Sequence, residues 1–234
     1  MLFRSNIESY RTFETKEWIS KLGITSIEDL DNIDHPYYYE VRLSNKCNLM
    51  CRSCKPEHSH LIQREFKKFN IIYPQRQTFQ YSSLDVIDIS TLNPKVRVYL
   101  TGGEPTIMPE VLTFMRNCIK AGKIDFDFTL GTNGQKISPA FLALADHFTN
   151  MNFSVSLDGF GKVNDYWRHG SDWDTIIANT KLLASRGHNI SINTVPGIYN
   201  VTNLHLLFEF LDQEFPNTTV YLQINHFGPQ IGRA

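Results

Sequence analysis

Three cysteines within eight positions are the residues of this chain best suited to chemistry. Cys47, Cys51 and Cys54 follow the spacing C-x3-C-x2-C in the run CNLMCRSC. Thiolates are the natural ligands of iron–sulfur clusters, and this close spacing lets one loop wrap three corners of a cubane. Three protein ligands leave one iron open to a substrate or a cofactor.

A zinc ion is the main rival for these thiols. Zinc requires a fourth ligand, and His58 or His60 lies close enough in the sequence to supply it. Each histidine taken separately is more often a polar residue at an exposed helix start. A disulfide would leave one of the three thiols over, and a reducing compartment favours metal binding or catalysis. The fourth cysteine, Cys118, falls on the apolar face of a predicted helix and is interpreted as a small core residue.

Six short runs rich in Val, Ile, Tyr and Phe predict β-strands bounded by turn residues. They cover residues 38–43, 96–100, 126–130, 152–157, 190–195 and 219–224. Helical periodicity begins near Pro109, Ser138, Asp172 and Asn203, with a weaker candidate at residues 57–69. Strand–helix alternation predicts a parallel α/β sheet with helical crossovers. About six such units follow from the count, which is fewer than the eight of a closed barrel.

The predicted domain organisation is one core with an N-terminal extension. Residues 1–36 are expected to form a helical extension centred on residues 15–22. Residues 37–234 are expected to form the partial-barrel core, with an irregular insertion at residues 70–93.

Polar or glycine-rich clusters directly follow the predicted strands. They occupy residues 44–47, 101–105, 131–134, 158–159, 196–197 and 225–226. The carboxyl ends of parallel strands face one side of the sheet, where ligands bind. Gly and Asn in any single cluster could equally be simple turn residues. The whole set, with cysteines in the first cluster, favours a binding site.

The cysteine motif after the first strand and the run GGEP after the second together resemble the radical S-adenosylmethionine (SAM) superfamily. The resemblance extends from about Tyr39 to Asn225. The run SLDG at 156–159, followed by NDYWR at 164–168, is similar to the SPASM/twitch branch, whose members often modify peptides and proteins. The pattern of motifs most resembles that of twitch-domain radical SAM proteins, some of which are phage-encoded. The resemblance implies a partial (β/α)6 TIM-like barrel of the radical SAM type.

The resemblance also implies two cofactors, a 4Fe–4S cluster and SAM. Cys47, Cys51 and Cys54 would ligate the cluster, whose open iron chelates the amino and carboxylate groups of SAM. One electron then breaks a sulfur–carbon bond, and the 5′-deoxyadenosyl radical abstracts hydrogen from a substrate. The protein's part is to bind, orient and exclude water.

Seven further residues are expected to bind SAM by this resemblance. They are Gly102, Gly103, Glu104, Asn133, Ser156, Asp158 and Arg168. The two glycines would let the backbone approach the methionyl group, since a Cβ would obstruct it. Glu104 would accept a hydrogen bond from the SAM ammonium, with a helix N-terminal carboxylate as the alternative.

The other four predicted contacts each have an ordinary structural alternative or depend on the resemblance alone. Asn133 is a polar contact to SAM or substrate, or a plain turn residue. Ser156 is placed like the family's ribose- or carboxylate-contacting serine. Asp158 binds the cofactor or caps the following turn. Arg168 matches the arginine that pairs with the SAM carboxylate in this branch.

Two departures from the family pattern stand out. Many members have an aromatic residue just before the third cysteine, where it packs near adenine, but this chain has Ser53. Backbone near residues 195–197, or an aromatic such as Phe227, would then hold adenine. SPASM and twitch proteins also carry extra cysteines for auxiliary clusters. Their absence predicts that the auxiliary domain has been lost or that this chain is the core of a longer protein.

The predicted function is a radical SAM enzyme that abstracts hydrogen from a peptide or protein. One alternative is an activase for a glycyl-radical enzyme, against which the pattern at 156–168 argues. Another is a small-molecule radical SAM enzyme, for example one that modifies a nucleotide precursor or sugar. A non-catalytic zinc-binding module is the alternative of another class. A flavodoxin- or ferredoxin-type electron donor is the expected partner of any of the enzymes.

Composition excludes some partners and places the protein in the cytoplasm. The 234 residues carry a formal net charge of −1, so no bulk charge favours DNA or an anionic membrane. No apolar run reaches the roughly 18 residues that span a bilayer. The first residues, MLFRSN, lack the apolar core of a secretory signal. A monomer is the default expectation.

Overall fold

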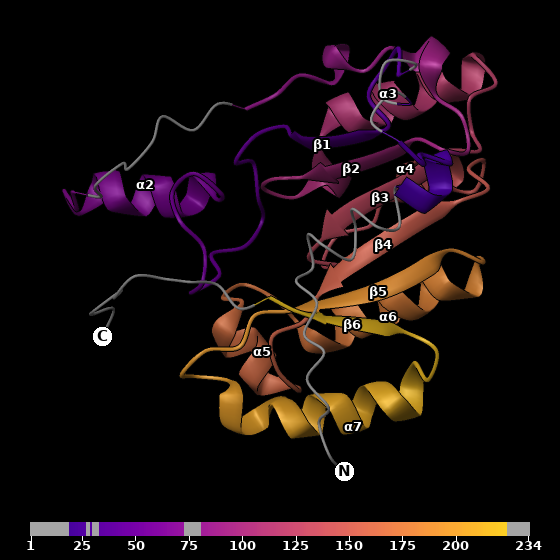
Figure 1. Ribbon diagram of the computed structural model, residues 1–234. Coiled ribbons are helices and arrows are strands. Elements are labelled where there is room, and N and C mark those ends of the chain that lie inside the picture. Colours follow the sequence, from indigo (N-terminus) through magenta and orange to yellow (C-terminus); the bar gives the residue numbers. More distant parts are fainter. Residues whose placement is uncertain (1–18, 27–28, 30–32, 73–80, 224–234) are drawn as a thin grey trace.

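Six parallel strands form one sheet in the order β1-β2-β3-β4-β5-β6 (Figure 1). The computed structural model describes residues 19–26, 29, 33–72 and 81–223. The strands are β1 (Tyr38–Arg42), β2 (Arg97–Thr101), β3 (Asp127–Thr132), β4 (Met151–Ser156), β5 (Asn189–Thr194) and β6 (Thr219–Leu222). Sequential order with parallel pairing throughout confirms the predicted α/β class and the partial (β/α)6 barrel.

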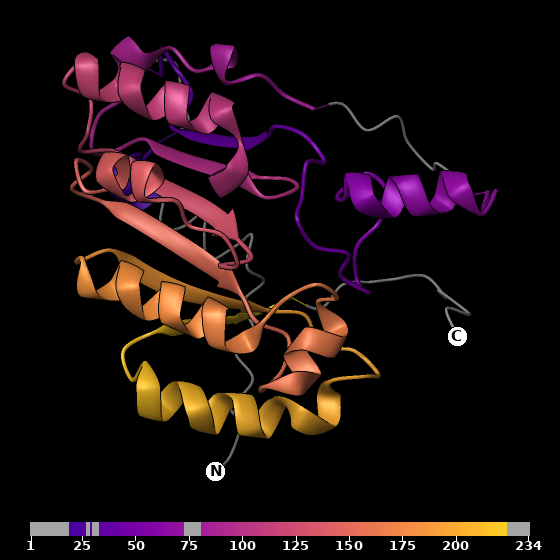
Figure 2. The same ribbon diagram turned by 180° about the vertical axis from the view of Figure 1, so that it is seen from behind.

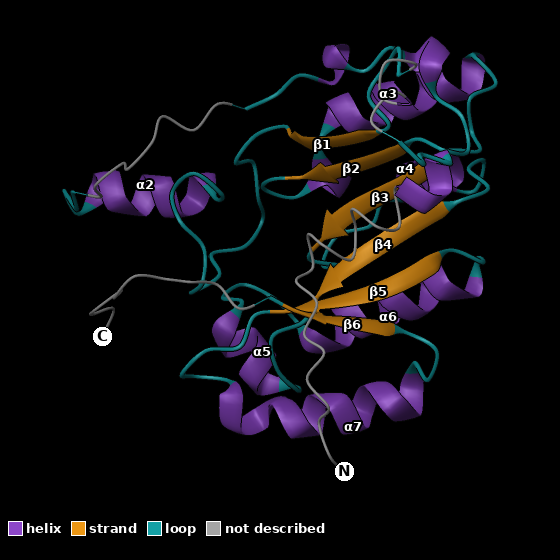
Figure 3. Ribbon diagram, viewed as in Figure 1, coloured by secondary structure: helices purple, strands orange, loops and turns teal. Residues whose placement is uncertain are grey.

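Helices cover one face of this sheet and extend beyond its carboxyl edge. The helices are α2 (His60–Lys68), α3 (Pro109–Lys120), α4 (Pro139–Ala145), α5 (Lys162–Trp167), α6 (Trp173–Ser185) and α7 (Leu204–Glu214). Short 3-10 turns occur at Leu84–Val86, Ile89–Thr91, Pro105–Ile107 and Val201–Asn203. Figure 2 shows α3, α4, α6 and α7 on the covered face. Figure 3 shows α2 standing apart from the sheet, on the side to which the strands point.

The two faces of the sheet differ sharply in chemistry. Side chains toward the helices are apolar and fully buried, as at Val98, Leu100 and Phe128. Side chains on the other face are polar and line an open cavity of about 1140 Å³, as at Tyr99 and Asn152. Parallel sheets are normally apolar on both faces. The polar concave face therefore indicates a lumen that holds water or a ligand.

Local capping explains where the predicted helices begin. The Ser138 side chain accepts a hydrogen bond from Phe141 N, with Pro139 in the first turn of α4. Asp172 caps α6 in the same way. Asn203 makes no cap bond through its side chain, because its Oδ1 accepts from Phe160 N at 2.7 Å instead.

Several elements differ from the sequence predictions or lie outside the described residues. Helix α5 was not predicted, because its six residues are too few to show a helical period. Cys118 is fully buried on α3, which confirms its core role. Residues 19–22 are helical, and the rest of the predicted helix at 15–22 lies outside the described residues, as do residues 225–226. In the part that the structure describes, no helix has the length and apolarity needed to cross a bilayer.

Candidate functional site

The carboxyl ends of the strands bring four of the predicted clusters to one edge of the sheet. The loop after β1 carries the cysteines, and its neighbours carry Glu104, Asn133 and Asp158. Hydrogen bonds between these loops join them: Glu104 N donates to Lys46 O at 2.8 Å, and Asn133 N donates to Glu104 Oε2 at 2.6 Å. The predicted convergence is therefore present in the fold.

The cysteine loop is held against the end of α5. Met50 N donates to His169 O at 2.9 Å, and Arg52 N donates to Trp167 O at 2.8 Å. The Arg52 guanidinium also lies 4.1 Å above the Tyr166 ring, and its Nε donates to Tyr166 O. These contacts on both sides of Cys51 place the thiols beside the residue that follows α5, which is Arg168.

The three thiols occupy different environments. Cys47 and Cys51 are buried and Cys54 is partly exposed. Burial raises the pKa of the Cys47 thiol to about 12. A hydrogen bond from Cys54, and then the charge of Arg168, outweigh burial and lower the pKa of Cys51 to about 7. Cys51 is therefore the thiol closest to the thiolate form that iron requires.

Donors from the surrounding backbone and from one side chain point at Cys47. Leu49 N lies 3.4 Å from Cys47 Sγ, and Asn133 Nδ2 lies 3.8 Å from the same sulfur. Hydrogen bonds to sulfur stabilise a thiolate and tune a cluster bound to it. The chemistry of this donor set therefore suits a cluster bound through thiolates.

The histidines do not complete a zinc site in the described residues. There, no three side chains of Cys, His, Asp or Glu gather closely enough to hold one metal ion. His60 Nδ1 accepts a hydrogen bond from Cys47 N at 3.2 Å, so this ring atom faces backbone. A cluster binds each thiolate at a different iron and does not need them to meet at one point. The arrangement thus fits a cluster better than zinc.

A buried ion pair lies next to the thiols. Arg168 Nη1 donates to Asp158 Oδ2 at 2.7 Å, and the Asp158 side chain is completely buried. Asp158 Oδ1 also accepts from Val195 N at 2.8 Å. Burial acts to lower the pKa of Arg168, but Cys51, Asp158 and Cys54 outweigh it and raise that pKa. Asp158 therefore holds the Arg168 guanidinium, which is permanently positive, beside the cysteine loop. It does not cap the following turn.

Several buried polar atoms around this ion pair lack a partner. Within the described residues these atoms are Asn164 Nδ2, Trp167 Nε1, Arg168 Nε and Asn193 Oδ1. An unsatisfied buried polar group costs about 1–3 kcal/mol, so four of them near the ends of β4 and β5 indicate a polar ligand. SAM carries carboxylate, ammonium and ribose groups of matching polarity. These residues therefore fit SAM as well as the thiols fit a cluster.

The two glycines after β2 let segments of this chain approach each other closely. Gly102 and Gly103 have positive φ angles of 87° and 49°. A Cβ on Gly103 would lie 2.2 Å from Lys46 O, and one on Gly102 would lie 2.4 Å from Arg42 Cγ. The space that a Cβ would need is thus filled by Arg42 at the end of β1 and by Lys46 of the cysteine loop, so the glycines let the segment after β2 pack against both.

Glu104 is fully buried and holds the end of β3. Its Oε1 accepts from Thr106 N, Thr106 Oγ1 and Thr132 Oγ1, while Oε2 accepts from Asn133 N alone among the residues that the structure describes. Burial raises the pKa of Glu104, and these four donors act in the opposite direction. The bond from Thr106 N corresponds to the predicted helix-cap alternative. Oε2 keeps room for one more donor, as the predicted ammonium contact requires.

Asn133 is a turn residue, as one of the two predicted alternatives has it, and it also contacts the cysteine loop. Its Oδ1 accepts from Gln135 N at 2.9 Å in a turn, and its Nδ2 donates to Asn48 Oδ1 at 2.8 Å. Ser156 ends β4 beside Asn193 on β5, and its side chain makes no hydrogen bond with the described residues.

Sequence reasoning missed Asn164 and Asn193, although one signal was available. Asn193 continues the alternation Asn189-Ser191-Asn193 along β5, which marks the polar face of the strand.

The expected adenine contact near residues 195–197 is partly altered, because Val195 N is bound to Asp158. A Cβ on Gly197 would lie 2.5 Å from Trp167 Cη2, so this backbone packs on the indole. Phe227 lies outside the described residues.

Gly103→Ala is expected to destabilise the fold more than Gly122→Ala. Both glycines have positive φ, which costs a residue with a Cβ about 1–2 kcal/mol, but a Cβ on Gly122 meets nothing within 4 Å. The additional loss of unfolding free energy in Gly103→Ala measures the clash of the new Cβ with Lys46. Urea unfolding of both variants and of the parent chain gives this difference. Equal losses would show that the two loops are not packed as described.

Comparison with known proteins agrees with this geometry. A model of the radical SAM superfamily matches residues 41–211. GTP 3',8-cyclase of Agrobacterium fabrum is 25% identical over 185 residues, which cover 76% of this chain and 46% of that protein. The chain thus spans about half the length of this curated relative.

Solved structures show a similar fold. Native anSMEcpe with bound AdoMet has a TM-score of 0.60 at 15% identity, over 85% of this chain and 55% of that one. Streptococcus suis SuiB bound to precursor peptide SuiA has a TM-score of 0.57 at 18% identity, over 95% and 47%. Together with the family match over most of the chain, these likenesses establish that the chain belongs to the radical SAM superfamily of enzymes, whose cofactors are a 4Fe–4S cluster and SAM.

Proposed function

We propose that this protein is a radical SAM enzyme in which Cys47, Cys51 and Cys54 hold the 4Fe–4S cluster. The observation that carries the proposal is the contact between the cysteine loop and the end of α5, which sets the thiols beside Arg168 and Asp158. When bound, the cluster and SAM supply a 5′-deoxyadenosyl radical that abstracts hydrogen from a substrate. The protein supplies the thiolates, the charges and the cavity in which the reactants are oriented.

Arg168 binds the SAM carboxylate in this proposal. Asp158 accepts a hydrogen bond from Arg168 Nη1. Arg168 Nε has no partner among the described residues, so it remains as a donor to the SAM carboxylate. Glu104 accepts from the SAM ammonium through Oε2, and Ser156 with Asn193 contacts the ribose. Asn133 acts by holding the cysteine loop through Asn48.

A peptide or protein is the substrate class that we propose. The concave face of the sheet lines a cavity of about 1140 Å³ with polar side chains. Arg97 and Asp127 of the lining pair at 2.7 Å, and Glu40 of the lining is offset by Arg42, which lies 3.7 Å away. A lining of this kind suits the neutral amides of a peptide better than a triphosphate, which is recognised by cations. SuiB, whose fold is similar, was solved with a precursor peptide.

A small-molecule substrate such as a nucleotide is the second candidate. It is favoured by the 25% identity to GTP 3',8-cyclase over 76% of this chain. A glycyl-radical activase has no comparable support here.

Transfer of deuterium into 5′-deoxyadenosine distinguishes the two substrate classes. The reconstituted protein is incubated anaerobically with dithionite and SAM, and with either a pool of perdeuterated peptides or deuterated GTP. We expect 5′-deoxyadenosine one mass unit heavier with the peptide pool, and no such shift with GTP or with Cys51→Ala. If 5′-deoxyadenosine acquires deuterium with GTP and not with the peptide pool, the peptide proposal is wrong and the nucleotide candidate replaces it.

Two finer assignments belong to this proposal. The SPASM/twitch branch is supported by the pattern from Ser156 to Arg168, which the fold places around one buried ion pair. A phage-encoded origin stays a prediction from the sequence. The cytoplasm is the compartment that we propose, because thiolates and an iron–sulfur cluster persist in a reducing environment.

A further inference from the structure

The segment that carries the cysteines is basic, although the chain as a whole is slightly acidic. Residues 46–70 contain six Lys or Arg and two Glu, a net charge of +4, whereas the whole chain has −1. The remainder therefore carries −5. The six basic residues are Lys46, Arg52, Lys55, Arg64, Lys67 and Lys68. Such an asymmetry produces a local positive field that composition alone conceals.

Helix α2 within this segment has an apolar face and a basic face. Ile62, Phe66 and Phe69 follow helical spacing on one side, and Ile62 is fully buried. Arg64, Lys67 and Lys68 lie three and four residues apart, which puts them on the opposite side, and all three are exposed. Their positive charges therefore face solvent.

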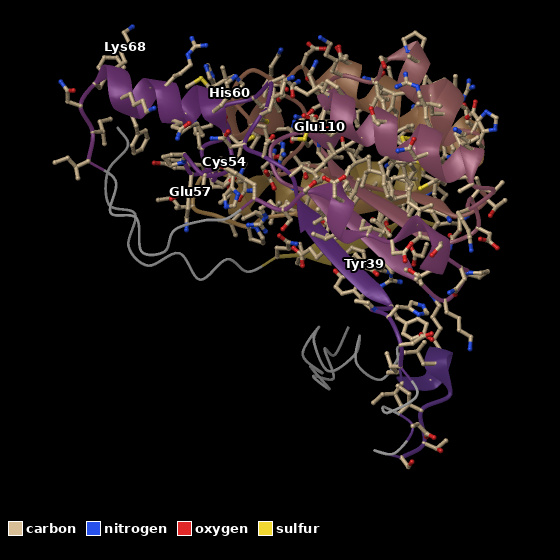
Figure 4. All side chains as sticks on the ribbon, turned by 90° about the horizontal axis from the view of Figure 1, so that it is seen from above. Tyr39, Cys54, Glu57, His60, Lys68 and Glu110 are labelled. Atoms are coloured by element: carbon tan, nitrogen blue, oxygen red, sulfur yellow. The ribbon has the colours of Figure 1, made fainter. Side chains whose placement is uncertain are left out.

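The basic face is rigidly connected to the thiols. Ser59 Oγ donates to Leu49 O at 2.8 Å, and His60 N donates to Asn45 O at 2.7 Å. Figure 4 shows Cys54 and His60 close together where α2 begins, with Lys68 at its far end. Cys54 is also the most exposed of the three motif cysteines. A protein bound along α2 would thus lie next to Cys54, the motif cysteine that solvent reaches most easily.

We propose that the exposed basic face of α2, together with the cysteine loop, docks an acidic one-electron donor protein, a flavodoxin or a ferredoxin. This inference rests on the proposed function, because a cluster at Cys47, Cys51 and Cys54 is what the donor reduces. One electron leaves the donor's reduced flavin or iron–sulfur centre and enters the cluster, and no atom is transferred. Opposite charges speed the encounter and orient the donor.

A nucleic acid fits this surface less well. The helix has nine residues, about 13 Å of length, and the remaining chain would repel an extended polyanion. A compact acidic protein needs only such a small patch, since weak electron-transfer encounters use interfaces at the low end of the size range.

The test is reversal of charge on α2 with a matched control elsewhere. The triple variant R64E/K67E/K68E changes the net charge by −6. The control K95E/R116E/K120E makes the same change at exposed positions before β2 and on α3, on the covered face of the sheet. Reduction of the reconstituted cluster is followed by stopped-flow absorbance with reduced flavodoxin and, separately, with dithionite. Binding of oxidised flavodoxin to the cluster-free proteins is measured at low and high salt.

We expect the α2 variant to react with flavodoxin at least about tenfold more slowly than the parent at low salt. Its reaction with dithionite and its circular dichroism should stay unchanged, and the control should resemble the parent. The cluster-free parent should bind flavodoxin more tightly at low salt than at high salt, and the α2 variant should lose this dependence. Equal flavodoxin rates and equal binding for the α2 variant and the parent would overturn the docking proposal. A parent without a reducible cluster would instead refute the proposed function, and the binding measurement would still decide the docking.

Discussion

Cys51→Ala is expected to abolish assembly of the iron–sulfur cluster. Cys51 is buried, and it has the thiol whose pKa is lowered to about 7 by Cys54 and Arg168. Two remaining thiolates cannot hold a cubane stably, and a neutral methyl group cannot replace the third. After anaerobic reconstitution with iron and sulfide, the variant should hold little of either and lack the visible absorption of a cluster.

Cys118→Ala is the matched control for this experiment. Cys118 is completely buried in the apolar core on α3, away from the strand ends. Its loss should cost stability but leave iron and sulfide content unchanged. A full complement of iron in Cys51→Ala, with a normal spectrum, would remove Cys51 from the site.

Arg168→Ala is expected to keep the cluster but to weaken SAM binding by about tenfold to a hundredfold. A hydrogen bond to a charged group contributes about 1.5–3 kcal/mol. Next to its ion pair with Asp158, the Arg168 guanidinium has an Nε that no described residue accepts from. Equilibrium dialysis of labelled SAM against the reconstituted variant measures the change, with iron content determined on the same sample.

Removal of Arg168 also leaves Asp158 buried without its partner. Breaking a buried ion pair in this way typically costs about 3–5 kcal/mol, so Arg168→Lys serves as a second variant that keeps the charge. It should fold and retain weakened SAM binding, because Lys lacks the planar fork. Arg186→Ala is the control, since Arg186 pairs with Asp146 at a more exposed position. SAM affinity unchanged in both position-168 variants would exclude Arg168 from the site.

The order of strands and the convergence of the loops could be predicted from sequence for a simple physical reason. Parallel strands buried against helices need apolar, β-branched runs, and the turn residues that follow them mark the carboxyl edge. These signals are local, so all six strands begin within one residue of the predicted positions. The cysteine spacing is also local, which is why the motif could be recognised.

Interactions between distant residues could not be predicted in the same way. The pairing of Arg168 with Asp158 and the bonds from Met50 and Arg52 to the end of α5 join segments far apart in the chain. Helix α5 has only six residues and no side-chain cap bond, so it carries little periodic signal.

The glycines after β2 show which part of a local role the residue type predicts. Their need for positive φ and close approach follows from the residue type. What approaches them, Lys46 O and Arg42 Cγ, depends on how two loops pack. The basic face of α2 was likewise concealed by a formal net charge of −1 for the whole chain.

Formation of 5′-deoxyadenosine is the most direct test of the central claim. The protein is reconstituted anaerobically with iron and sulfide, given dithionite and SAM, and compared by mass spectrometry with a variant in which Cys47, Cys51 and Cys54 are all Ala. We predict 5′-deoxyadenosine well above the level of the triple variant. A protein that binds iron and sulfide at these cysteines, yet forms no more 5′-deoxyadenosine than the variant even with the peptide pool present, would contradict the proposal that this site cleaves SAM.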